Sequence, residues 1–226
     1  MSSASVKICG IRSMEQLQPI LHLPIDHIGF MFVPSSKRRI TAAEAAPMVA
    51  AIRGNNGIES VGVFVNPTME ELEQVMREAP LDVIQLHGQE SPAFCAEVKR
   101  TFGVKLFKAL PVASSASETG AELIAEEDRL TAYAGIADAI LLDTYDPVVG
   151  GGTGQPFAWN RIPAYRRRAG ELGMKLVVAG GLHHGNVDEL IRDYEPDGVD
   201  VSSGVETDGV KDTNKIKAFV ERVKSS

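Results

Sequence analysis

The sequence predicts an α/β protein, a single closed (β/α)8 TIM barrel of eight parallel strands that spans residues 1–226. Short apolar segments rich in β-branched residues alternate with longer amphipathic segments, which is typical of parallel strands joined by helical crossovers. A chain of 226 residues is long enough for eight such units. The first apolar segment is followed by CGIRS and not by the GxGxxG pattern of an open nucleotide-binding sheet. No Pro/Ser-rich linker divides the chain into two domains.

Each predicted strand is an apolar run that ends at a glycine, a proline, an asparagine or a histidine, or close to one. The eight strands are expected at 6–9, 27–33, 60–65, 82–87, 104–110, 138–143, 175–180 and 197–202. Near-continuous apolar runs of this kind indicate strands that are buried on both faces.

Amphipathic patterns fill most of the intervals between these strands. Helices are predicted at 13–23, 41–54, 68–79, 91–103, 186–194 and 214–224. Thr68 and Glu71 have the spacing of a capping box, and Ser91 followed by Pro92 is a typical helix start.

Two intervals are less regular. Residues 111–135 are rich in Ser and Ala, so the sequence defines a helix there poorly. Residues 144–159, TYDPVVGGGTGQPFAW, form a Gly-rich loop after the sixth strand. This loop is either a mobile lid over a substrate or a long plain connection.

Composition and charge exclude several functional classes. Hydrophobic residues make up 44% of the chain and charged residues 23%, as in ordinary globular proteins. The net charge of −7 and the pI of ≈ 5.3 argue against nucleic acid or an anionic membrane as a partner. A small anionic ligand is still allowed, because backbone amides can bind phosphate on an acidic protein. The sequence has no signal-peptide pattern and no apolar segment of membrane-spanning length.

The cysteines and histidines show no metal-binding spacing. Cys9 and Cys95 are too few for a disulfide framework and lie outside any CxxC or HExxH pattern. His183 and His184 have no carboxylate or cysteine at ligand spacing, so we expect them at the surface. A reducing cytoplasm is the compartment that this cysteine content favours.

In a (β/α)8 barrel, the active site lies on the loops that follow the strands. The candidate site residues are therefore the polar and small residues at predicted strand ends: Cys9, Lys37, Arg38, His87, Asp143, Gly180, Gly181, Ser202, Ser203 and Gly204. Strand alternation places Lys7 on the same face as Cys9, and Gln85 on the same face as His87. A lysine near a thiol favours the thiolate, which is the basic form of cysteine.

Each polar candidate also has a purely structural interpretation. A cysteine is most often a packing residue, and we assign Cys95, inside an amphipathic helix, to that class. Asp143 could cap the turn that follows it, and His87 could be a hydrogen-bonded histidine at a strand end. Lys37 and Arg38 could belong to a solvated charged loop.

Glycines after the last two strands indicate a phosphate site. The segments GGL at 180–182 and SSGVE at 202–206 follow the seventh and eighth strands. In barrels these two loops often bind phosphate through backbone amides and the start of a short extra helix. A glycine allows close approach because it has no Cβ.

Taken together and in order, several short segments resemble the phosphoribosylanthranilate isomerase family from about residue 6 to the end of the chain. These segments are VKICGI, GFMFVPSSKRRI, VGVFVN, IQLHGQE, LLDT, GGGTGQPFAW, AGGL and VDVSSGVE. Each segment alone is a weak match, but the ordered set is specific. The resemblance implies an enzyme of tryptophan biosynthesis on a (β/α)8 barrel. Its reaction is the Amadori rearrangement of N-(5-phosphoribosyl)anthranilate to the 1-deoxyribulose 5-phosphate product, without a metal or an organic cofactor.

The resemblance also implies a role for each candidate residue. The general base of the family corresponds to Cys9, its general acid to Asp143, and its carboxylate-binding arginine to Arg38. His87 and Lys7 would line the site. The phosphate contacts correspond to Gly180, Gly181, Asp200, Ser202, Ser203 and Gly204. We expect a small phosphosugar as the partner and a monomer, with a homodimer as the alternative.

Three other functions compete with this interpretation. An indole-glycerol-phosphate synthase would need a catalytic lysine at a strand end, for which Lys105 or Lys108 could serve. A pentose-phosphate epimerase would need a set of metal-binding histidines that this chain lacks. A non-catalytic phosphosugar-binding barrel would need neither Cys9 nor Asp143. The related isomerisation of histidine synthesis is usually associated with two acidic residues, so Cys9 disfavours that substrate.

Overall fold

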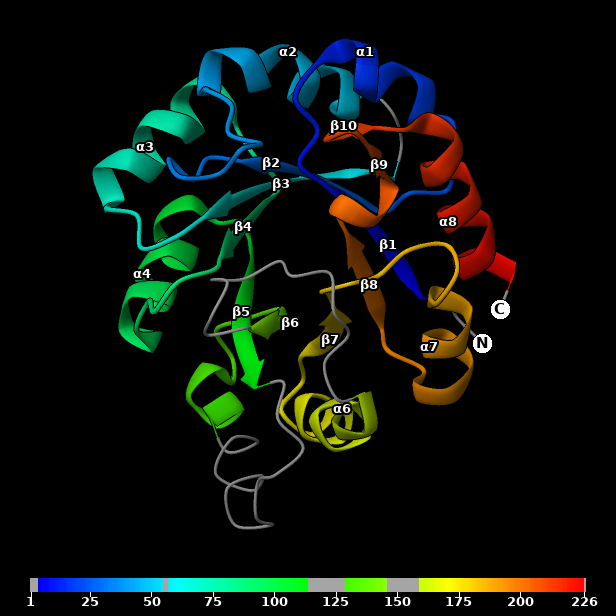
Figure 1. Cartoon of the computed structure of the whole chain (residues 1–226). Helices are drawn as coiled ribbons and strands as arrows, with labels where there is room; N and C mark the ends of the chain where they lie inside the picture. Colours follow the sequence, from blue (N-terminus) through cyan, green and yellow to red (C-terminus); the bar gives the residue numbers. More distant parts are fainter. Residues whose placement is uncertain (1–3, 55–56, 114–128, 146–158, 226) are drawn as a thin grey trace.

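The computed structural model describes residues 4–54, 57–113, 129–145 and 159–225, and Figure 1 shows the whole chain. Eight parallel strands close into a barrel in their order along the sequence, with β1 hydrogen-bonded to both β2 and β8. The strands are β1 (Ser5–Cys9), β2 (His27–Met31), β3 (Glu59–Phe64), β4 (Val83–Leu86), β5 (Lys105–Ala113), β6 (Ala139–Tyr145), β7 (Lys175–Val178) and β8 (Gly198–Val201). The predicted (β/α)8 fold is confirmed.

All eight predicted strands are present, and most ends lie within two residues of the prediction. The clearest difference is at β5 and β6, which continue to Ala113 and Tyr145. These extensions pair with each other, Val112 with Thr144 and Ala113 with Tyr145. The backbone groups of each extended strand therefore find their partners on the other strand.

Helices surround the strands in Figure 1. The helical elements are α1 (Met14–Leu17), η1 (Gln18–Ile20), α2 (Ala42–Arg53), α3 (Met69–Glu78), α4 (Pro92–Phe102), η2 (Arg129–Tyr133), η3 (Trp159–Arg161), α6 (Ile162–Glu171), α7 (Val187–Tyr194), η4 (Ser203–Val205) and α8 (Thr213–Ser225). The helix predicted at 13–23 is instead a short α-helix that continues as a 3₁₀ turn. Pro19 lies in that turn and has no amide hydrogen, so it cannot donate a hydrogen bond to a carbonyl of the preceding helical turn.

The helix caps predicted from the sequence at Thr68 and Ser91 are confirmed. Thr68 accepts a hydrogen bond from the Glu71 amide at 3.2 Å, and the Glu71 carboxylate accepts one from the Thr68 amide at 2.8 Å. Ser91 caps α4 by accepting from the Phe94 amide. Each cap satisfies an amide at a helix start that has no partner within the helix.

Between β6 and β7 the structure contains a helix that the sequence patterns did not single out, α6. It begins with Pro163 in its first turn and packs against β7. Most of the Gly-rich loop at 144–159 and most of the interval 111–135 lie outside the described residues. The prediction of a lid is therefore not addressed by the structure.

Side chains alternate between two apolar cores. The barrel interior is filled by Val61, Val83, Phe107, Ala109, Ala139, Leu141, Val177 and Ala179. The intervening strand residues, such as Val6, Ile8 and Val199, pack outward into the larger core under the helices. Inward-facing residues beyond the last apolar layer therefore reach the mouth of the barrel at the C-terminal ends of the strands.

A small hairpin follows the last strand. β9 (Glu206–Thr207) pairs antiparallel with β10 (Val210–Lys211) after the single 3₁₀ turn of η4. In Figure 1 this hairpin lies near the C-terminal end of β1, on the way to α8. It supplies two charged residues to the candidate site.

Candidate active site

Cys9 is the last residue of β1, and its side chain belongs to the inward-facing set together with Lys7. Its neighbours Val6 and Ile8 pack outward. Cys9 is 4% exposed, and a Cβ on the adjacent Gly29 would lie 2.9 Å from the Cys9 sulfur. The absence of a side chain at Gly29 therefore provides the space that the thiol occupies.

Lys7 and Asp200 form a buried ion pair below the thiol. Lys7 Nζ lies 2.8 Å from Asp200 Oδ2, because β1 and β8 are paired with these two residues in register. Burial alone would lower the pKa of Lys7, but the charges of Asp200 and Cys9 outweigh it and the net direction is upward. Lys7 therefore remains an ammonium ion.

The thiol itself is harder to ionise than an ordinary cysteine. Burial raises the pKa of Cys9, and the positive charge of Lys7 only partly opposes this effect. The sequence-based expectation that Lys7 increases the thiolate fraction has the correct sign for the lysine alone. The net pKa of Cys9 is nevertheless raised, because desolvation of the thiolate is the larger influence.

The expected phosphate contact of Asp200 does not fit this geometry. Its carboxylate is bound to Lys7 inside the barrel, and a negative carboxylate repels a phosphate. Asp200 Oδ1 is buried and has no hydrogen-bond partner among the described residues. We therefore assign Asp200 to the support of Lys7.

Asp143 and His87 meet at the mouth of the barrel. Asp143 follows Leu141 by two residues on β6, and Leu141 points into the interior. His87 Nε2 lies 3.1 Å from Asp143 Oδ2, and His87 Nδ1 lies 3.0 Å from the side-chain nitrogen of Gln85. The structure thus brings together the predicted acid, the predicted lining histidine and a glutamine to which the sequence had assigned no role.

Arg38 is held by a residue that the sequence analysis did not select. Its Nε and Nη2 donate to the two carboxylate oxygens of Glu206 at 2.6 and 2.7 Å. Lys211 Nζ donates to the same carboxylate at 2.7 Å. Burial acts to raise the pKa of Glu206, but the hydrogen bonds from Arg38 and Lys211 bring it down to about 2. Glu206 is therefore a carboxylate throughout the physiological range.

The loops after β7 and β8 approach each other closely. A Cβ on Gly204 would collide with the carbonyl oxygen of Leu182, so only glycine allows this approach. Gly180 and Gly181 have φ angles of 86° and 64°, a region that favours glycine. Ser202 donates to the Cys9 carbonyl at 3.1 Å, which ties this pair of loops to the end of β1.

The remaining candidates lie elsewhere. Lys37 is exposed, and His183 and His184 are exposed as predicted. Lys108 is buried against Glu90 at 3.0 Å and donates to the carbonyl of Leu86, the last residue of β4, and to that of Gly88 in the following loop. Its ammonium has no free direction toward a substrate.

Lys105 is also unsuited to the synthase alternative. It lies at the start of β5 and pairs with Glu59 at 2.6 Å, at the opposite end of the barrel from the strand ends that carry Cys9 and Asp143. Neither lysine nominated for the indole-glycerol-phosphate synthase alternative is placed to act there.

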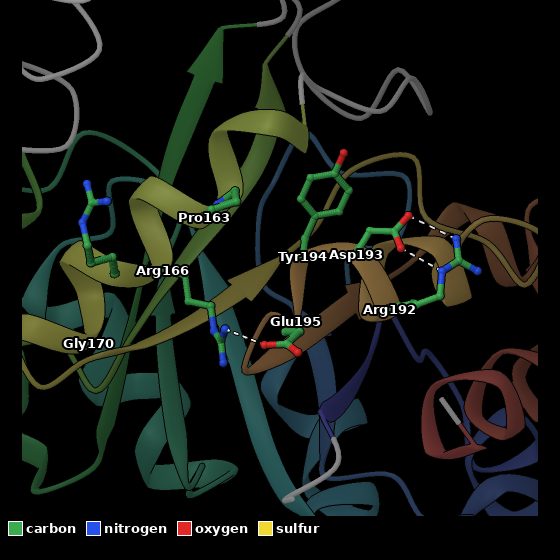
Figure 2. A pocket seen from close by; sticks show the side chains of 8 residues that line it. Pro163, Arg166, Gly170, Arg192, Asp193, Tyr194 and Glu195 are labelled. Carbon is green, nitrogen blue, oxygen red and sulfur yellow. Dashed lines mark hydrogen bonds and ion pairs between the residues drawn. The ribbon is translucent and has the colours of Figure 1, made fainter.

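An open groove of about 450 Å³ lies away from this site, between α6 and α7 (Figure 2). Four of its charged side chains form two ion pairs, Arg166 with Glu195 at 3.1 Å and Arg192 with Asp193 at 2.7 Å. None of the candidate site residues lines this groove.

The fold and the site define a class of protein, a (β/α)8-barrel enzyme with acid–base groups at its strand ends. The sequence model of the family described as "N-(5'phosphoribosyl)anthranilate (PRA) isomerase" matches residues 6–222. The chain belongs to this family. It is therefore an isomerase of tryptophan biosynthesis. Of the helices within the described ranges, none is long and apolar enough to cross a membrane.

Individual relatives agree with this assignment. The N-(5'-phosphoribosyl)anthranilate isomerase of Brevibacillus brevis is 49% identical over 220 residues, which cover 97% of this chain and 93% of that protein. The crystal structure of the phosphoribosyl anthranilate isomerase of Thermotoga maritima superposes with a TM-score of 0.81 at 34% identity, covering 99% of this chain and 100% of that one. A phosphoribosyl anthranilate isomerase solved in complex with reduced 1-(o-carboxyphenylamino)-1-deoxyribulose 5-phosphate has a TM-score of 0.78 at 32% identity, with 99% and 100% coverage.

Proposed function

We propose that the chain isomerises N-(5'-phosphoribosyl)anthranilate to 1-(2-carboxyphenylamino)-1-deoxyribulose 5-phosphate with Asp143 as general acid and Cys9 as general base. The observation that carries this proposal is the position of the two side chains. Both face inward at the C-terminal ends of strands of one closed barrel. A single sugar held over the barrel mouth would be accessible to both groups.

Each group has one proton to move. Asp143 donates a proton to the furanose ring oxygen, the C1–O bond breaks, and the nitrogen lone pair forms an iminium ion. Cys9 then removes the proton from C2, and the electrons of that C–H bond neutralise the iminium to give an enolamine. Loss of the C2 hydroxyl proton and addition of a proton at C1 complete the ketone. The protons balance, and no metal or cofactor is needed.

The environment of Cys9 suits a base that must remove a proton from carbon. A buried thiolate with a raised pKa is a stronger base than an ordinary one, although it is less populated. Lys7 lies beside the thiolate that forms and stabilises its charge, and Asp200 keeps Lys7 in place. Lys7 therefore contributes to the site without contacting the reacting carbon.

Arg38 is proposed to bind the anthranilate carboxylate. Glu206 occupies the Nε and Nη2 edge of the guanidinium, which leaves the Nη1 side for a second carboxylate. Gly10 allows this placement, because a Cβ there would lie 2.6 Å from Arg38 Cδ. Lysine at position 38 would bind a carboxylate less well because it lacks a planar pair of donors.

The substrate phosphate is proposed to bind at the loops after β7 and β8, at Gly180, Gly181, Ser202, Ser203 and Gly204. The two loops approach each other closely and the two glycines after β7 have positive φ angles, a backbone arrangement in which successive amides can bind an anion. Binding the phosphate there would fix the sugar over Cys9 and Asp143, because remote contacts orient the reacting atoms.

The deciding experiment replaces the base. Cys9→Ala should keep the fold and a KM within a few-fold of the wild type, and kcat should fall by about 10²–10⁴-fold. Turnover can be followed directly by the fluorescence of the anthranilate group. Cys95→Ala, which removes the other buried thiol, is the matched control. Near-normal turnover of Cys9→Ala would reject the proposed base.

Two broader properties belong to the same proposal. We place the enzyme in a reducing compartment, the cytoplasm, because the mechanism needs Cys9 as a free thiol and both cysteines are free in the structure. We also propose that it works as a monomer, since one barrel supplies every group that the reaction uses.

A further inference from the structure

Lys211 is a buried lysine of the candidate site to which the proposed mechanism gives no role. Its side chain is 2% exposed, and it lies on β10 directly opposite Glu206 of β9. Asp208 and Gly209 connect the two strands, and both have positive φ angles, as a two-residue type I′ turn requires. This turn sets the register that places the lysine beside the carboxylate.

The ammonium group of Lys211 has three hydrogen-bond acceptors. Nζ donates to the Ser202 carbonyl at 2.9 Å, to the Ser202 hydroxyl at 3.2 Å and to Glu206 Oε1 at 2.7 Å. A lysine ammonium has three hydrogens, and these three contacts account for them. Lys211 therefore acts on the site by holding other groups and not by binding the substrate itself.

Two of these contacts fix the loop after β8. The peptide bond between Ser202 and Ser203 is planar and trans, so its N–H points away from its C=O. By holding the Ser202 carbonyl, Lys211 fixes the direction of the Ser203 amide, which is one of the proposed phosphate contacts. The Ser202 hydroxyl accepts from Lys211 and donates to the Cys9 carbonyl at 3.1 Å. The loop is thus also tied to the end of β1.

The third contact fixes the carboxylate that holds Arg38. Glu206 accepts from Arg38 on both oxygens, at 2.6 and 2.7 Å, and from Lys211 on Oε1. Two cations therefore share one carboxylate whose side chain is 7% exposed. Without Lys211, Glu206 would keep Arg38 as a partner but would lose the cross-strand contact that fixes its own position.

We infer that Lys211 is a positioning residue that couples the two ends of the substrate site, the phosphate loop after β8 and the carboxylate-binding Arg38. Both ends are attached to one buried ammonium group, so the distance between them is set before the substrate arrives. The substrate carries its phosphate and its carboxylate at opposite ends, and their spacing determines where C2 lies relative to Cys9. The inference rests on the proposed binding of these two groups.

The test measures binding at one end of the site and at both. Inorganic phosphate carries no carboxylate and should compete with the substrate. Lys211→Met should raise its Ki by about three- to tenfold, the loss expected for one hydrogen bond that orders a binding group. The KM of the full substrate should rise further, because both ends are disturbed. Partial unfolding would lower the amount of active enzyme but would change neither Ki nor KM.

Two variants serve as controls. Glu206→Gln keeps an oxygen that accepts from Lys211 and disturbs the carboxylate end, so Ki for inorganic phosphate should change by less than about twofold. Lys224 is a lysine at the opposite end of the barrel that also donates to a carbonyl, that of Ala4, and to a carboxylate, that of Asp26. Lys224→Met should lower thermal stability and leave Ki and KM unchanged.

Binding constants decide the test because kcat has a second cause of change. Burial is the main reason for the raised pKa of the Cys9 thiol, and the charges of Lys7 and Lys211 partly oppose it. Lys211→Met should therefore also lower kcat, since the thiolate loses a neighbouring positive charge.

The outcomes separate this inference from the proposed function. If inorganic phosphate does not compete with the substrate on the wild-type enzyme, the proposed phosphate site is wrong and the inference falls with it. If phosphate competes and Lys211→Met leaves its Ki unchanged, the inference alone is overturned.

A second pair of variants covers the case in which Lys211→Met does not fold. The double variant Lys211→Met/Glu206→Gln keeps the net charge of the cluster and is compared with Glu206→Gln alone. The double variant should have the higher Ki for inorganic phosphate, by the same three- to tenfold factor of about one hydrogen bond. Equal Ki values in these two variants would overturn the inference.

Discussion

Cys9 shows how burial and a neighbouring charge act in opposite directions on one thiol. The sulfur lies beside an ammonium group, yet the pKa of the thiol is raised. Burial destabilises the thiolate more than the positive charge of Lys7 stabilises it. In the free enzyme, Cys9 is therefore mainly in its protonated thiol form. A nearby lysine is not sufficient to predict a reactive cysteine from sequence.

This balance predicts how the thiol titrates. Difference ultraviolet absorbance between the wild type and Cys9→Ser should show thiolate formation only above the ordinary thiol pKa of ~8.5, so that Cys9 is almost fully protonated at neutral pH. Lys7→Met should move the titration to still higher pH, because it removes the charge that lowers the pKa of Cys9. A midpoint below the ordinary value would contradict the role of burial.

Asp200 illustrates why residue roles carried over from a motif need the structure. Its place in VDVSSGVE suggested a phosphate contact, and the ion pair with Lys7 shows a different use of the same carboxylate. The partner lies 193 residues away, so no local pattern connects the two.

At the scale of elements, the β9–β10 hairpin places Glu206 and Lys211 beside Arg38. Glu206 is the last residue of the SSGVE segment, which the sequence analysis noted only for its glycine and serines. The segment was recognised, but no role was assigned to its carboxylate. The hairpin holds the arginine in one orientation before the substrate arrives, which reduces the entropy that binding must lose.

This arrangement predicts a binding defect when the hairpin carboxylate is neutralised. Glu206→Gln should raise KM by about tenfold and change kcat less, because hydrogen bonds to charged groups contribute about 1.5–3 kcal/mol and only part of this reaches the substrate. Steady-state kinetics provide the measurement. Glu195→Gln, which breaks the exposed pair with Arg166, is the matched control and should leave KM unchanged. An effect on kcat alone would argue against a role in carboxylate binding.

The helices show which local signals were reliable. The capping pattern at Thr68 and Glu71 placed the start of α3 correctly, because a cap depends on residues within one turn. The helix α6 was missed because it follows a Gly-rich stretch and carries the polar run Arg166–Arg168, so its apolar face is narrow. Pro19, inside the predicted helix at 13–23, explains why the α-helix gives way to a 3₁₀ turn in the structure.

At the scale of the whole molecule, closure of β1 against β8 brings the ends of the chain together. Cys9 and Lys7 from the start meet Asp200, Ser202 and the hairpin from the end only because the barrel closes. The site is assembled from loops of one barrel, which supports the proposal of a monomer.

The proposed monomer can be tested by sedimentation equilibrium. Among the described residues, Val65 and Val210 are the exposed large hydrophobic side chains, fewer than a stable dimer interface normally uses. We expect a single species with the mass of one chain, 24.3 kDa, at micromolar concentration. A homodimer of constant mass on dilution would contradict the proposal.

The sequence by itself determined the fold class, the positions of the strands and most of the residues at their C-terminal ends. These properties follow from periodicity, capping and turn chemistry, which act over a few residues. Only the tertiary structure decided that Lys7 binds Asp200, that Arg38 is held by Glu206, and that Gln85 and His87 reach Asp143. Lys7 and Asp200 lie 193 residues apart in the chain, and Arg38 and Glu206 lie 168 residues apart. His87 and Asp143 lie 56 residues apart. Their meeting depends on the register in which the barrel closes, and that register is set by the packing of all eight strands together.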